Sequence, residues 1–484
     1  MRQRLKSSVA GALLFPLIVA GCAKVGPDYQ PPQVQTPIAW SEAAAGPESG
    51  ETDLRNWWQG FGDPLLEDLV AQAVAGNLDL QMAARRVIAA KADRVAIAAG
   101  GLPTLGAGVS AANSRSSEML TWPPGVGEYK TYQYGLESSW ELDVFGGTRR
   151  AVEAADAASG AAAEDRRGIM VALLGDLASD YTLLRFSQKR LEIAHRNIAA
   201  EQKALELSER AYKAGLGTDM DVARARAAVE TSQSQIPPLE ANIARMGHAI
   251  ALLLGRFPGD LKADGVLARL VLPLPKDLVL PPLPGTLPSE MVRNRPDIRR
   301  AERQIAAATA RVGVATAELF PHFKIPLGIG PMTSNMVNLL ESDALVWTFG
   351  LSATQTLYDG GKSNAHIRAA EAVAEQDRLA YRQTILQAFR EVEDRLVGYR
   401  TEQDRHASLV AAAADEAQAF DRATRLYASG LTDFLKVLDS ERALFHAEDS
   451  LAQSEQAQAL DLIGLYRALG GGWQEADREV ASTE

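Results

Sequence analysis

Several residue types are scarce in this chain of 484 residues, and each scarcity excludes a class of protein. A single cysteine excludes a disulfide framework and any cysteine zinc site. Basic residues number 50 against 61 acidic ones, and the net charge of −11 argues against a nucleic-acid binder. Aromatic residues make up only 6%, which suits long alanine-rich helices better than a large sandwich core. The hydrophobic content of 46% excludes a polytopic helical membrane protein.

Sites for catalysis or metal binding are also missing from the sequence. The histidines stand at positions 195, 248, 322, 366, 406 and 446, without the spacing of metal ligands. No phosphate-binding loop, serine-nucleophile motif or dinucleotide fingerprint occurs. We therefore predict a protein that is not an enzyme and holds no metal.

The N-terminus has the pattern of a secretory signal peptide over residues 1–21. Three cations precede an apolar run at 9–20, which is too short to cross a bilayer as a helix. The run ends at Gly21-Cys22 and resembles a bacterial lipobox, in which Cys22 becomes the lipidated first residue. Ala23 follows instead of aspartate, which in the usual sorting pattern indicates the outer membrane. The alternative is an ordinary signal peptide with a coincidental cysteine.

The rest of the chain divides into an N-terminal tether and two halves that repeat each other. Proline and glycine between Val25 and Pro32 exclude helix, so residues 22–64 are predicted to begin as an extended tether. Short matching motifs recur in the same order at a separation of 214–218 residues, which indicates an internal duplication. We predict repeat 1 at 65–254, a proline-rich connector at 255–288, repeat 2 at 289–472 and a polar tail at 473–484.

Each repeat is predicted to contain a helix, two strands, a very long helix and a shorter return helix. The first helices are expected at 65–100 and 287–317, and the strands at about 103–118, 129–145, 320–332 and 344–358. The long helices are expected at 148–214 and 363–429, which are free of proline and carry apolar residues every seven positions. At 1.5 Å per residue each would be about 100 Å long. The return helices are expected at 219–254, interrupted by Pro237-Pro238, and at 433–469.

The strands alternate between an apolar, aromatic-bearing face and a polar face. In the second strand, Tyr132, Tyr134, Leu136, Trp140, Leu142 and Val144 alternate with polar residues that include Glu141 and Asp143. With outer-membrane targeting, this pattern favours strands of a membrane barrel over a soluble sheet. Four strands cannot close a barrel, so the barrel has to be shared between subunits.

Several motifs in this order resemble the outer membrane factor family, the TolC-like channels of tripartite efflux pumps, and in particular its lipoprotein branch related to NodT. The motifs include Cys22 with Val25-Gly26-Pro27-Asp28-Tyr29, and Trp57-Trp58 with Phe61-Gly62-Asp63-Pro64. They continue with Asn294-Arg295-Pro296-Asp297-Ile298 and Ala301-Glu302, and with Tyr427-Ala428-Ser429-Gly430-Leu431 through Val437-Leu438-Asp439.

The resemblance implies a mixed α and transmembrane β fold. Three chains would share a 12-stranded outer-membrane barrel, and their long helices would form a coiled-coil barrel crossing the periplasm. It also implies a passive exit duct for drugs or other small toxic compounds, served by a periplasmic adaptor (membrane fusion) protein and an inner-membrane resistance-nodulation-division transporter. The only attached group would be covalent lipid on Cys22, N-palmitoyl and S-diacylglycerol.

The resemblance further assigns roles at the periplasmic end. The residues expected to contact the adaptor at the tip are Tyr212, Gly215, Leu216, Tyr427, Gly430 and Leu431. The expected gate residues are Leu435 and Asp439, one turn apart on one helix face. The first half has Met220 and Arg224 at the matching positions. Lys436 and Thr432 depart from residues found in some relatives, which leaves the tightness of the closed tip open.

Two alternatives to the efflux duct stay open at this point. One is the outer-membrane duct of an ABC-driven secretion system, which the sequence does not separate from an efflux duct. The other is a lipid-anchored coiled-coil scaffold without a pore. An amphipathic sheet with an aromatic outer face argues against the scaffold, because a scaffold has no use for such a face.

Overall fold

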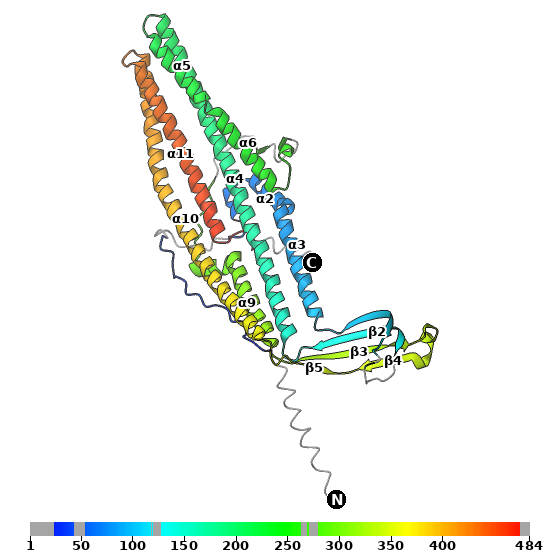
Figure 1. Ribbon diagram of the computed structural model, residues 1–484. Helices are drawn as coiled ribbons and strands as arrows, with labels where there is room; N and C mark the ends of the chain where they lie inside the picture. Colours follow the sequence, from blue (N-terminus) through cyan, green and yellow to red (C-terminus); the bar gives the residue numbers. More distant parts are fainter. Residues whose placement is uncertain are drawn as a thin grey trace. The chain divides into compact units, whose positions relative to one another are not determined.

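The computed structural model describes most of the chain between Lys24 and Gln474 (Figure 1). The described residues are 24–42, 54–117, 119, 127–262, 269–270 and 279–474. The predicted signal peptide at 1–21 and the lipidation candidate Cys22 lie outside them. The chain forms two compact units, one with Met1–Gln33, Arg86–Ala163 and Arg300–Arg382, and the other with Val34–Arg85, Glu164–Arg299 and Gln383–Glu484.

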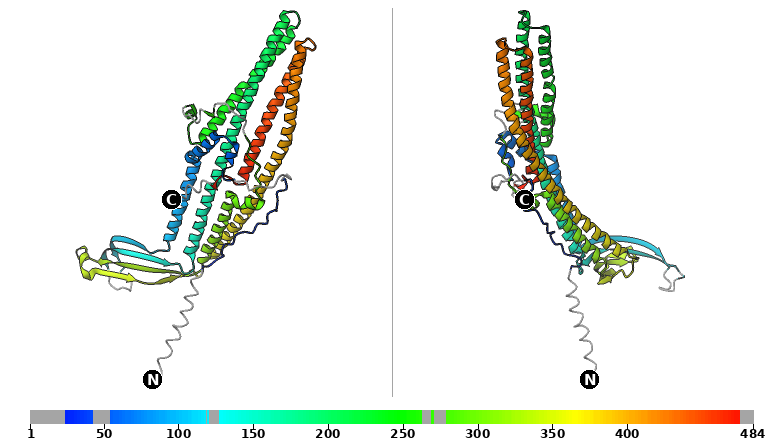
Figure 2. Two further views of the ribbon diagram at one scale, coloured as in Figure 1. Left: turned by 180° about the vertical axis from the view of Figure 1, so that it is seen from behind. Right: turned by 90° about the vertical axis from the view of Figure 1, so that its left-hand side faces the viewer.

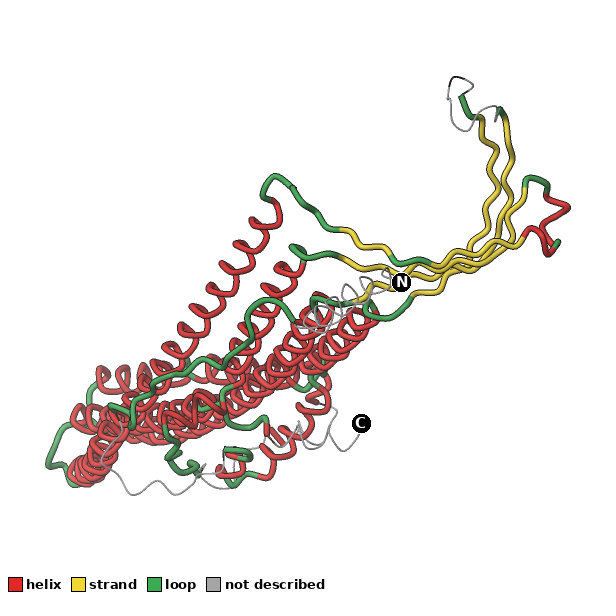
Figure 3. Tube along the Cα trace, turned by 90° about the horizontal axis from the view of Figure 1, so that it is seen from below, coloured by secondary structure: helices red, strands yellow, loops and turns green. Residues whose placement is uncertain are grey.

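The first unit contains the sheet, whose strands run side by side in Figure 3. The strands are β1 (Thr104–Arg115), β2 (Glu128–Leu142), β3 (His322–Thr333), β4 (Leu345–Phe349) and β5 (Ser352–Thr354). All pairs are antiparallel in the order β1-β2-β3-β4, and β5 also pairs with β3. Between β3 and β4 lie two short 3-10 turns, η3 (Met336–Leu340) and η4 (Ser342–Ala344).

The pairing register places most of the large apolar residues on one face of the sheet. Opposite pairs include Val109 with Tyr134, Leu136 with Ile329, Trp140 with Ile325, Ile329 with Trp347, and Leu327 with Phe349. Because residues that pair across antiparallel strands share a face, these side chains form one continuous apolar surface. Most of them are exposed on the isolated chain. The other face carries residues such as Gln133, Glu137, Glu141 and Lys324.

The second strand ends earlier than the sequence predicts. Val144 and Asp143 were expected within it, but β2 ends at Leu142. The carboxylate of Asp143 instead accepts hydrogen bonds from the backbone N–H groups of Thr148 (3.0 Å) and Arg149 (2.9 Å) at the start of the following helix. An aspartate before a helix satisfies N–H groups that have no partner within the helix. Here this capping is more favourable than the extension of β2 through Asp143 and Val144.

The predicted long helices are α4 (Gly147–Lys213) and α10 (Lys362–Ala428), each of 67 residues. Their seven-residue seam is deeply buried at Met170, Leu177 and Leu184 in α4 and at Val392 in α10. Towards the C-terminal end of α4 the seam residues become more exposed, and Tyr212 is 51% exposed. Among the described residues, the structure contains no helix of sufficient length and apolarity to span a bilayer.

The return helices lie beside the long ones in both views of Figure 2. The first is split into α5 (Asp219–Gln233) and α6 (Ile236–Leu253), with Pro237 and Pro238 in the first turn of α6. The second, α11 (Phe434–Ala468), is continuous. Proline is compatible with the first turn of a helix but not with its interior, so the break falls just before the two prolines.

The first helix of each half is broken, where the sequence predicts single helices over 65–100 and 287–317. The structure has α2 (Pro64–Gly76) and α3 (Leu78–Ala99), and α8 (Pro288–Asn294) and α9 (Pro296–Ala317). Asn77 and Arg295 stand at the two breaks, and both are buried. Asn77 Nδ2 donates to the carbonyl of Leu253 at 2.9 Å, and Arg295 Nη1 donates to that of Ala468 at 2.7 Å.

These two contacts explain the breaks. Leu253 and Ala468 are the last residues of α6 and α11, whose final carbonyls have no partner within the helix. Extended backbone at Asn77 and Arg295 lets the side chain reach that carbonyl. Two further segments complete the second unit: η1 (Trp57–Phe61), where Trp57 stacks on Tyr466 at 5.2 Å, and η2 (Pro258–Lys262).

Candidate functional site

The two ends of the long helices have the same backbone geometry. Gly215 and Gly430 have positive φ angles of 74° and 69°. Leu216 N donates to the carbonyl of Ala211 and Leu431 N to that of Leu426, both at 2.9 Å. These are the hydrogen bonds of a helix end that reverses through a left-handed glycine. Both leucines project from the turn and are largely exposed, so each corner presents one apolar side chain.

The two tip tyrosines occupy equivalent positions but different surroundings. Tyr427 packs its ring against Phe434 with centroids 5.4 Å apart, next to a buried cluster of Ala225, Ala228 and Leu438. Burial raises the pKa of the Tyr427 hydroxyl, and the nearby Asp221 adds to this effect. The first half has Asp219 where the second has Phe434, so Tyr212 has no such ring to pack against and stays half exposed.

The predicted gate residues lie on the first turns of α11. Asp433 caps this helix, since its carboxylate accepts from the backbone N–H of Lys436 at 3.0 Å. Leu435 and Asp439 are both exposed on the isolated chain and one turn apart, whereas Val437 and Leu438 between them are buried. The helix therefore places both predicted gate side chains on a face that its own chain leaves uncovered.

A buried arginine that the sequence analysis did not identify holds the N-terminal tether. Arg150, in the first turn of α4, is 1% exposed. Its Nε donates to the carbonyl of Val25 at 3.0 Å, and its Nη2 donates to the carbonyl of Gly26 at 3.1 Å and to Asp28 Oδ1 at 2.8 Å. Nη1 donates to Glu153 at 2.9 Å. Arg150 therefore binds the tether motif mainly through its backbone carbonyl groups.

Other parts of the tether are also fixed by side chains distant in the sequence. Tyr29 Oη donates to Glu302 Oε1 at 2.9 Å, which joins two of the motifs that carry the family resemblance. Further along, Trp40 Nε1 donates to the carbonyl of Thr286 at 2.8 Å. Ser41 donates from its hydroxyl to Glu393 at 2.7 Å and from its backbone N–H to the same carboxylate at 2.8 Å.

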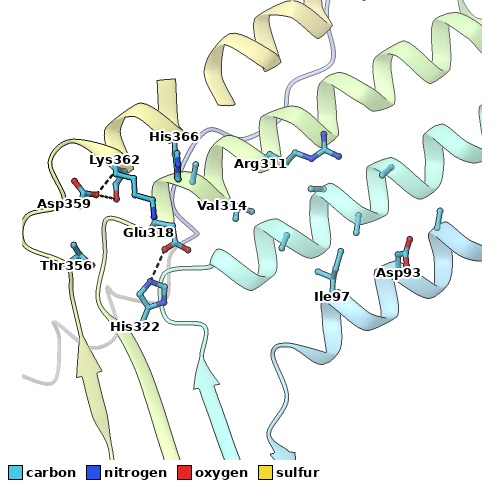
Figure 4. Close-up of a pocket in the computed structure, with 17 residues that line it drawn as sticks. Asp93, Ile97, Arg311, Val314, Glu318, His322, Thr356, Asp359, Lys362 and His366 are labelled. Atoms are coloured by element: carbon cyan, nitrogen blue, oxygen red, sulfur yellow. Dashed lines mark hydrogen bonds and ion pairs between the residues drawn. The ribbon is translucent and has the colours of Figure 1, made fainter. Parts of the chain in front are cut away.

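The first unit contains an open cavity of about 920 Å³, shown in Figure 4. Small alanines of α4 line part of it, and polar side chains of other elements project towards it, among them Glu318, His322 and His366. His322 contacts Glu141 at 2.8 Å and Glu318 at 3.6 Å. Hydrogen bonds from the Ser363 hydroxyl and backbone lower the pKa of nearby Asp359 to about 2, as expected for an aspartate that caps α10.

This cavity brings together two histidines that the sequence analysis treated as unrelated. Even so, no group of three or more histidine, cysteine or acidic side chains in the described part of the chain is arranged to hold a metal ion. His406 is partly buried and lies 3.9 Å from Glu455.

The residues missed from the sequence share one feature, which is a partner far away in the chain. Arg150, Asn77 and Arg295 each bind a backbone carbonyl of a distant segment. Asn77 and Arg295 gave a signal, because Asn77-Leu78-Asp79-Leu80 and Arg295-Pro296-Asp297-Ile298 match each other in the two halves of the chain. No local pattern distinguishes Arg150 from its exposed neighbour Arg149, since helix periodicity does not reveal which side receives the tether.

Comparison with known proteins gives a consistent result over nearly the whole chain. The family described as outer membrane efflux protein matches residues 69–256 and 287–471. Nodulation protein T of Rhizobium leguminosarum bv. viciae is 32% identical over 97% of this chain and 94% of its own length. The toluene efflux pump outer membrane protein TtgI of Pseudomonas putida is 32% identical over 95% of this chain and 97% of its own length.

Solved structures agree with these relatives. The outer-membrane channel OprN superposes with a TM-score of 0.87 at 36% identity and covers 93% of this chain and 100% of the solved chain. A structure of CusC superposes with a TM-score of 0.81 at 27% identity, with the same coverage. The order of helices and strands is also the same in the two family-matched segments of this chain.

Proposed function

Because the chain belongs to the outer membrane efflux protein family and is a protein of the outer membrane, we propose that it forms the exit duct of a tripartite efflux pump. Three copies share a 12-stranded barrel, and their long helices enclose a periplasmic tunnel. Substrates pass through passively, delivered by an inner-membrane resistance-nodulation-division transporter through a periplasmic adaptor. The cargo class we propose is small toxic compounds, by analogy with relatives named for toluene, solvent and cation efflux.

The register of the sheet is the observation that carries this proposal. It places most of the large apolar side chains of the strands on one face and most of the charged groups on the other. Within the described residues, β1 has a strand partner on one side only, and so do β4 and β5, which together make the fourth strand. Open edges are not tolerated in lipid, so the edge strands need partners from further copies.

At the glycine-containing ends of the long helices, the proposal assigns roles to exposed residues. Leu216 and Leu431 would contact the adaptor together with Tyr212, Gly215 and Gly430, while Tyr427 would support the turn through its packing on Phe434. Leu435 and Asp439 would narrow the tunnel, because three copies of this face meet at a three-fold axis. Three carboxylates close to such an axis repel each other and favour cations.

We also propose that Cys22 carries the lipid anchor and that the two halves arose by duplication. Acyl chains on Cys22 would hold the tether close to the membrane, with each buried CH₂ contributing about 0.8 kcal/mol. Arg150 fixes the tether only a few residues later in the chain.

Electron microscopy of the detergent-extracted mature protein tests the channel directly. We expect a three-fold particle with a continuous tunnel and a helical portion about 100 Å long. A solid or extended particle without a lumen would favour the scaffold instead. The lipid assignment is tested by intact mass: Cys22→Ser should lose the mass of the acyl groups, and an unchanged mass would exclude lipidation at this residue.

The secretion-duct alternative differs in its partner rather than in the shape of the particle. Co-purification with a resistance-nodulation-division transporter, rather than with an ATP-driven one, would distinguish the two. The relatives named for efflux favour the first.

A further inference from the structure

A series of ion pairs, each between a basic and an acidic side chain, joins α4 to α11. Arg467 Nη1 lies 2.6 Å from Asp176, Lys189 Nζ lies 2.6 Å from Glu455, and Arg190 Nε lies 2.6 Å from Asp449. Closer to the tip, Arg196 and Glu448 are 3.5 Å apart. The pairs advance along α4 as they go back along α11, as expected for two antiparallel helices in constant register.

At the next position of this register two acidic residues face each other, Glu201 of α4 and Glu441 of α11. Both are almost fully buried, with 4% and 3% of their surface exposed. Glu201 Oε1 accepts from the Ser232 hydroxyl at 2.9 Å, but its Oε2 has no hydrogen-bond partner. Neither carboxylate oxygen of Glu441 has one. The next layer towards the tip is the apolar cluster that contains Leu438 and Ala225.

Two buried carboxylates in this position cannot both carry a charge at low cost, because desolvation and mutual repulsion disfavour the ionised forms. Burial raises the pKa of Glu441 to about 7, and the charge of Glu201 adds to the rise while Arg442 opposes it. Burial also raises the pKa of Glu201, against the hydrogen bonds from Ser232 and Asn197 and the charge of Arg442.

Other charged groups on the surrounding helices do not compensate the pair. On α5, Arg226 and Glu230 are exposed, and Arg226 is 3.5 Å from Glu209. On α4, Lys203 and Glu206 are exposed. On the adjoining part of α10, Glu416 is partly exposed and the other charged side chains are exposed, namely Asp415, Asp421, Arg422 and Arg425. Arg442 is thus the cation whose charge reaches both carboxylates.

We propose that Glu201 and Glu441 form a proton-binding site that couples the packing of α11 against α4 to the pH of the periplasm. With a proton bound, the site carries at most one charge and the two helices stay in contact. When the proton is lost, two buried charges face each other and the tip half of α11 separates more readily from α4. At the matching position of the first return helix the chain has Arg226, so only α11 carries this site.

The site deepens the proposed function, because α11 also carries Leu435 and Asp439. Asp439 is exposed and Glu441, two residues later, is buried, so one turn of helix holds a predicted gate side chain on one face and the proton site on another. Its link to the gate rests on the proposed channel. The proton site itself does not, because the exchange of the amides of α11 can be measured whether or not the protein conducts.

Hydrogen exchange of the purified full-length protein in detergent, read by mass spectrometry at pH 6 and pH 8, tests the site. After correction for intrinsic exchange rates, protection of amides 434–448 should fall as the pH rises. The local opening equilibrium should increase by up to about tenfold per pH unit through the range in which Glu441 ionises. Glu441→Gln is neutral at both pH values and should remove the pH dependence while keeping high protection. Glu201→Gln should weaken the dependence.

Glu448→Gln is the matched control, since it removes an acid of the same helix that has an ordinary partner. It should lower protection at both pH values and leave the pH dependence unchanged. A flat profile in the wild type, or a fall in Glu441→Gln equal to that of the wild type, would overturn the proposal. If Mg²⁺ added at pH 8 restores protection in the wild type but not in Glu441→Gln, the site binds a hard cation rather than a proton, and the proton assignment is wrong.

The exchange result is independent of conductance. A particle without a tunnel would contradict the proposed channel but not the proposed proton site. A channel in which the protection of α11 does not depend on pH would contradict the proposed proton site but not the proposed channel.

Discussion

Arg150 holds Gly26 from a distance of more than a hundred residues in the chain, by donating from Nη2 to its carbonyl at 3.1 Å. The same arginine bonds Val25 and Asp28, and it is almost completely buried. The tether is therefore held as part of the folded protein within a few residues of the proposed lipid anchor.

Replacing Arg150 should release this part of the tether. Arg150→Ala leaves two carbonyls without their charged donor, and we expect a loss of about 2–3 kcal/mol in the free energy of unfolding. Arg150→Lys should recover only part of it, because lysine lacks the forked donors. Faster cleavage by chymotrypsin at Tyr29 would report the release. Lys24→Ala, which removes an exposed ion pair with Glu153, should cost less than about 1 kcal/mol.

Gly313 in α9 should resist substitution because it lies against Arg150. A Cβ there would come within 2.8 Å of the Arg150 side chain, and a Cβ on Gly26 would lie 2.5 Å from Gly313 Cα. We expect Gly313→Ala to destabilise by about 1–3 kcal/mol through overpacking. Gly160→Ala is the control, since its Cβ would meet only ordinary contacts with Arg303 and should be neutral or stabilising. Equal melting temperatures of the two variants would contradict the close packing.

Asn77 is expected to contribute through two separate hydrogen bonds. Its Oδ1 caps α3 at Leu80 N and its Nδ2 caps the end of α6 at the Leu253 carbonyl, each at 2.9 Å. Asn77→Ala should cost about 1–3 kcal/mol, whereas Asn77→Asp keeps only the first bond. Chemical denaturation should therefore rank Asn77→Asp between the wild type and Asn77→Ala. If Asn77→Asp is as stable as the wild type, the contact with Leu253 contributes nothing.

Asp180 should make stability depend on pH. Burial raises the pKa of Asp180 to about 6, and the neighbouring Asp176 adds to the rise. The pKa of Asp180 is higher in the folded state than in the unfolded state. The contribution of its protonation to the free energy of unfolding is therefore fully present below the unfolded pKa of about 3.9 and is lost as the pH rises through about 6. Asp180→Asn should raise the melting temperature at pH 7.5 and change it little near pH 4. A gain of equal size at both values would indicate a cause other than ionisation.

The proposed gate is tested by conductance in planar bilayers. Asp439→Ala replaces a side chain that narrows the tunnel by a smaller one, so it should widen the closed tip and raise the conductance. Asp439→Asn, which removes the charge at nearly constant volume, should reduce the preference for cations. Arg224→Ala changes the matching position of the first half and should not reduce that preference. Unchanged conductance and selectivity in both Asp439 variants would remove Asp439 from the gate.

The sequence by itself determined the local structure. Two runs of 67 residues without proline became α4 and α10, and Gly215 and Gly430 became their ends, because these features act within a few residues of the backbone. Strand alternation likewise separates an apolar face from a polar one before any partner strand is known.

Only the tertiary structure decided which distant groups meet. The breaks at Asn77 and Arg295, the contact of Arg150 with the tether and the opposition of Glu201 and Glu441 all depend on register between separate segments. Periodicity tells which residues share a face, but the axial offset between two helices is set by the sum of many weak contacts along both of them. No single motif encodes that sum.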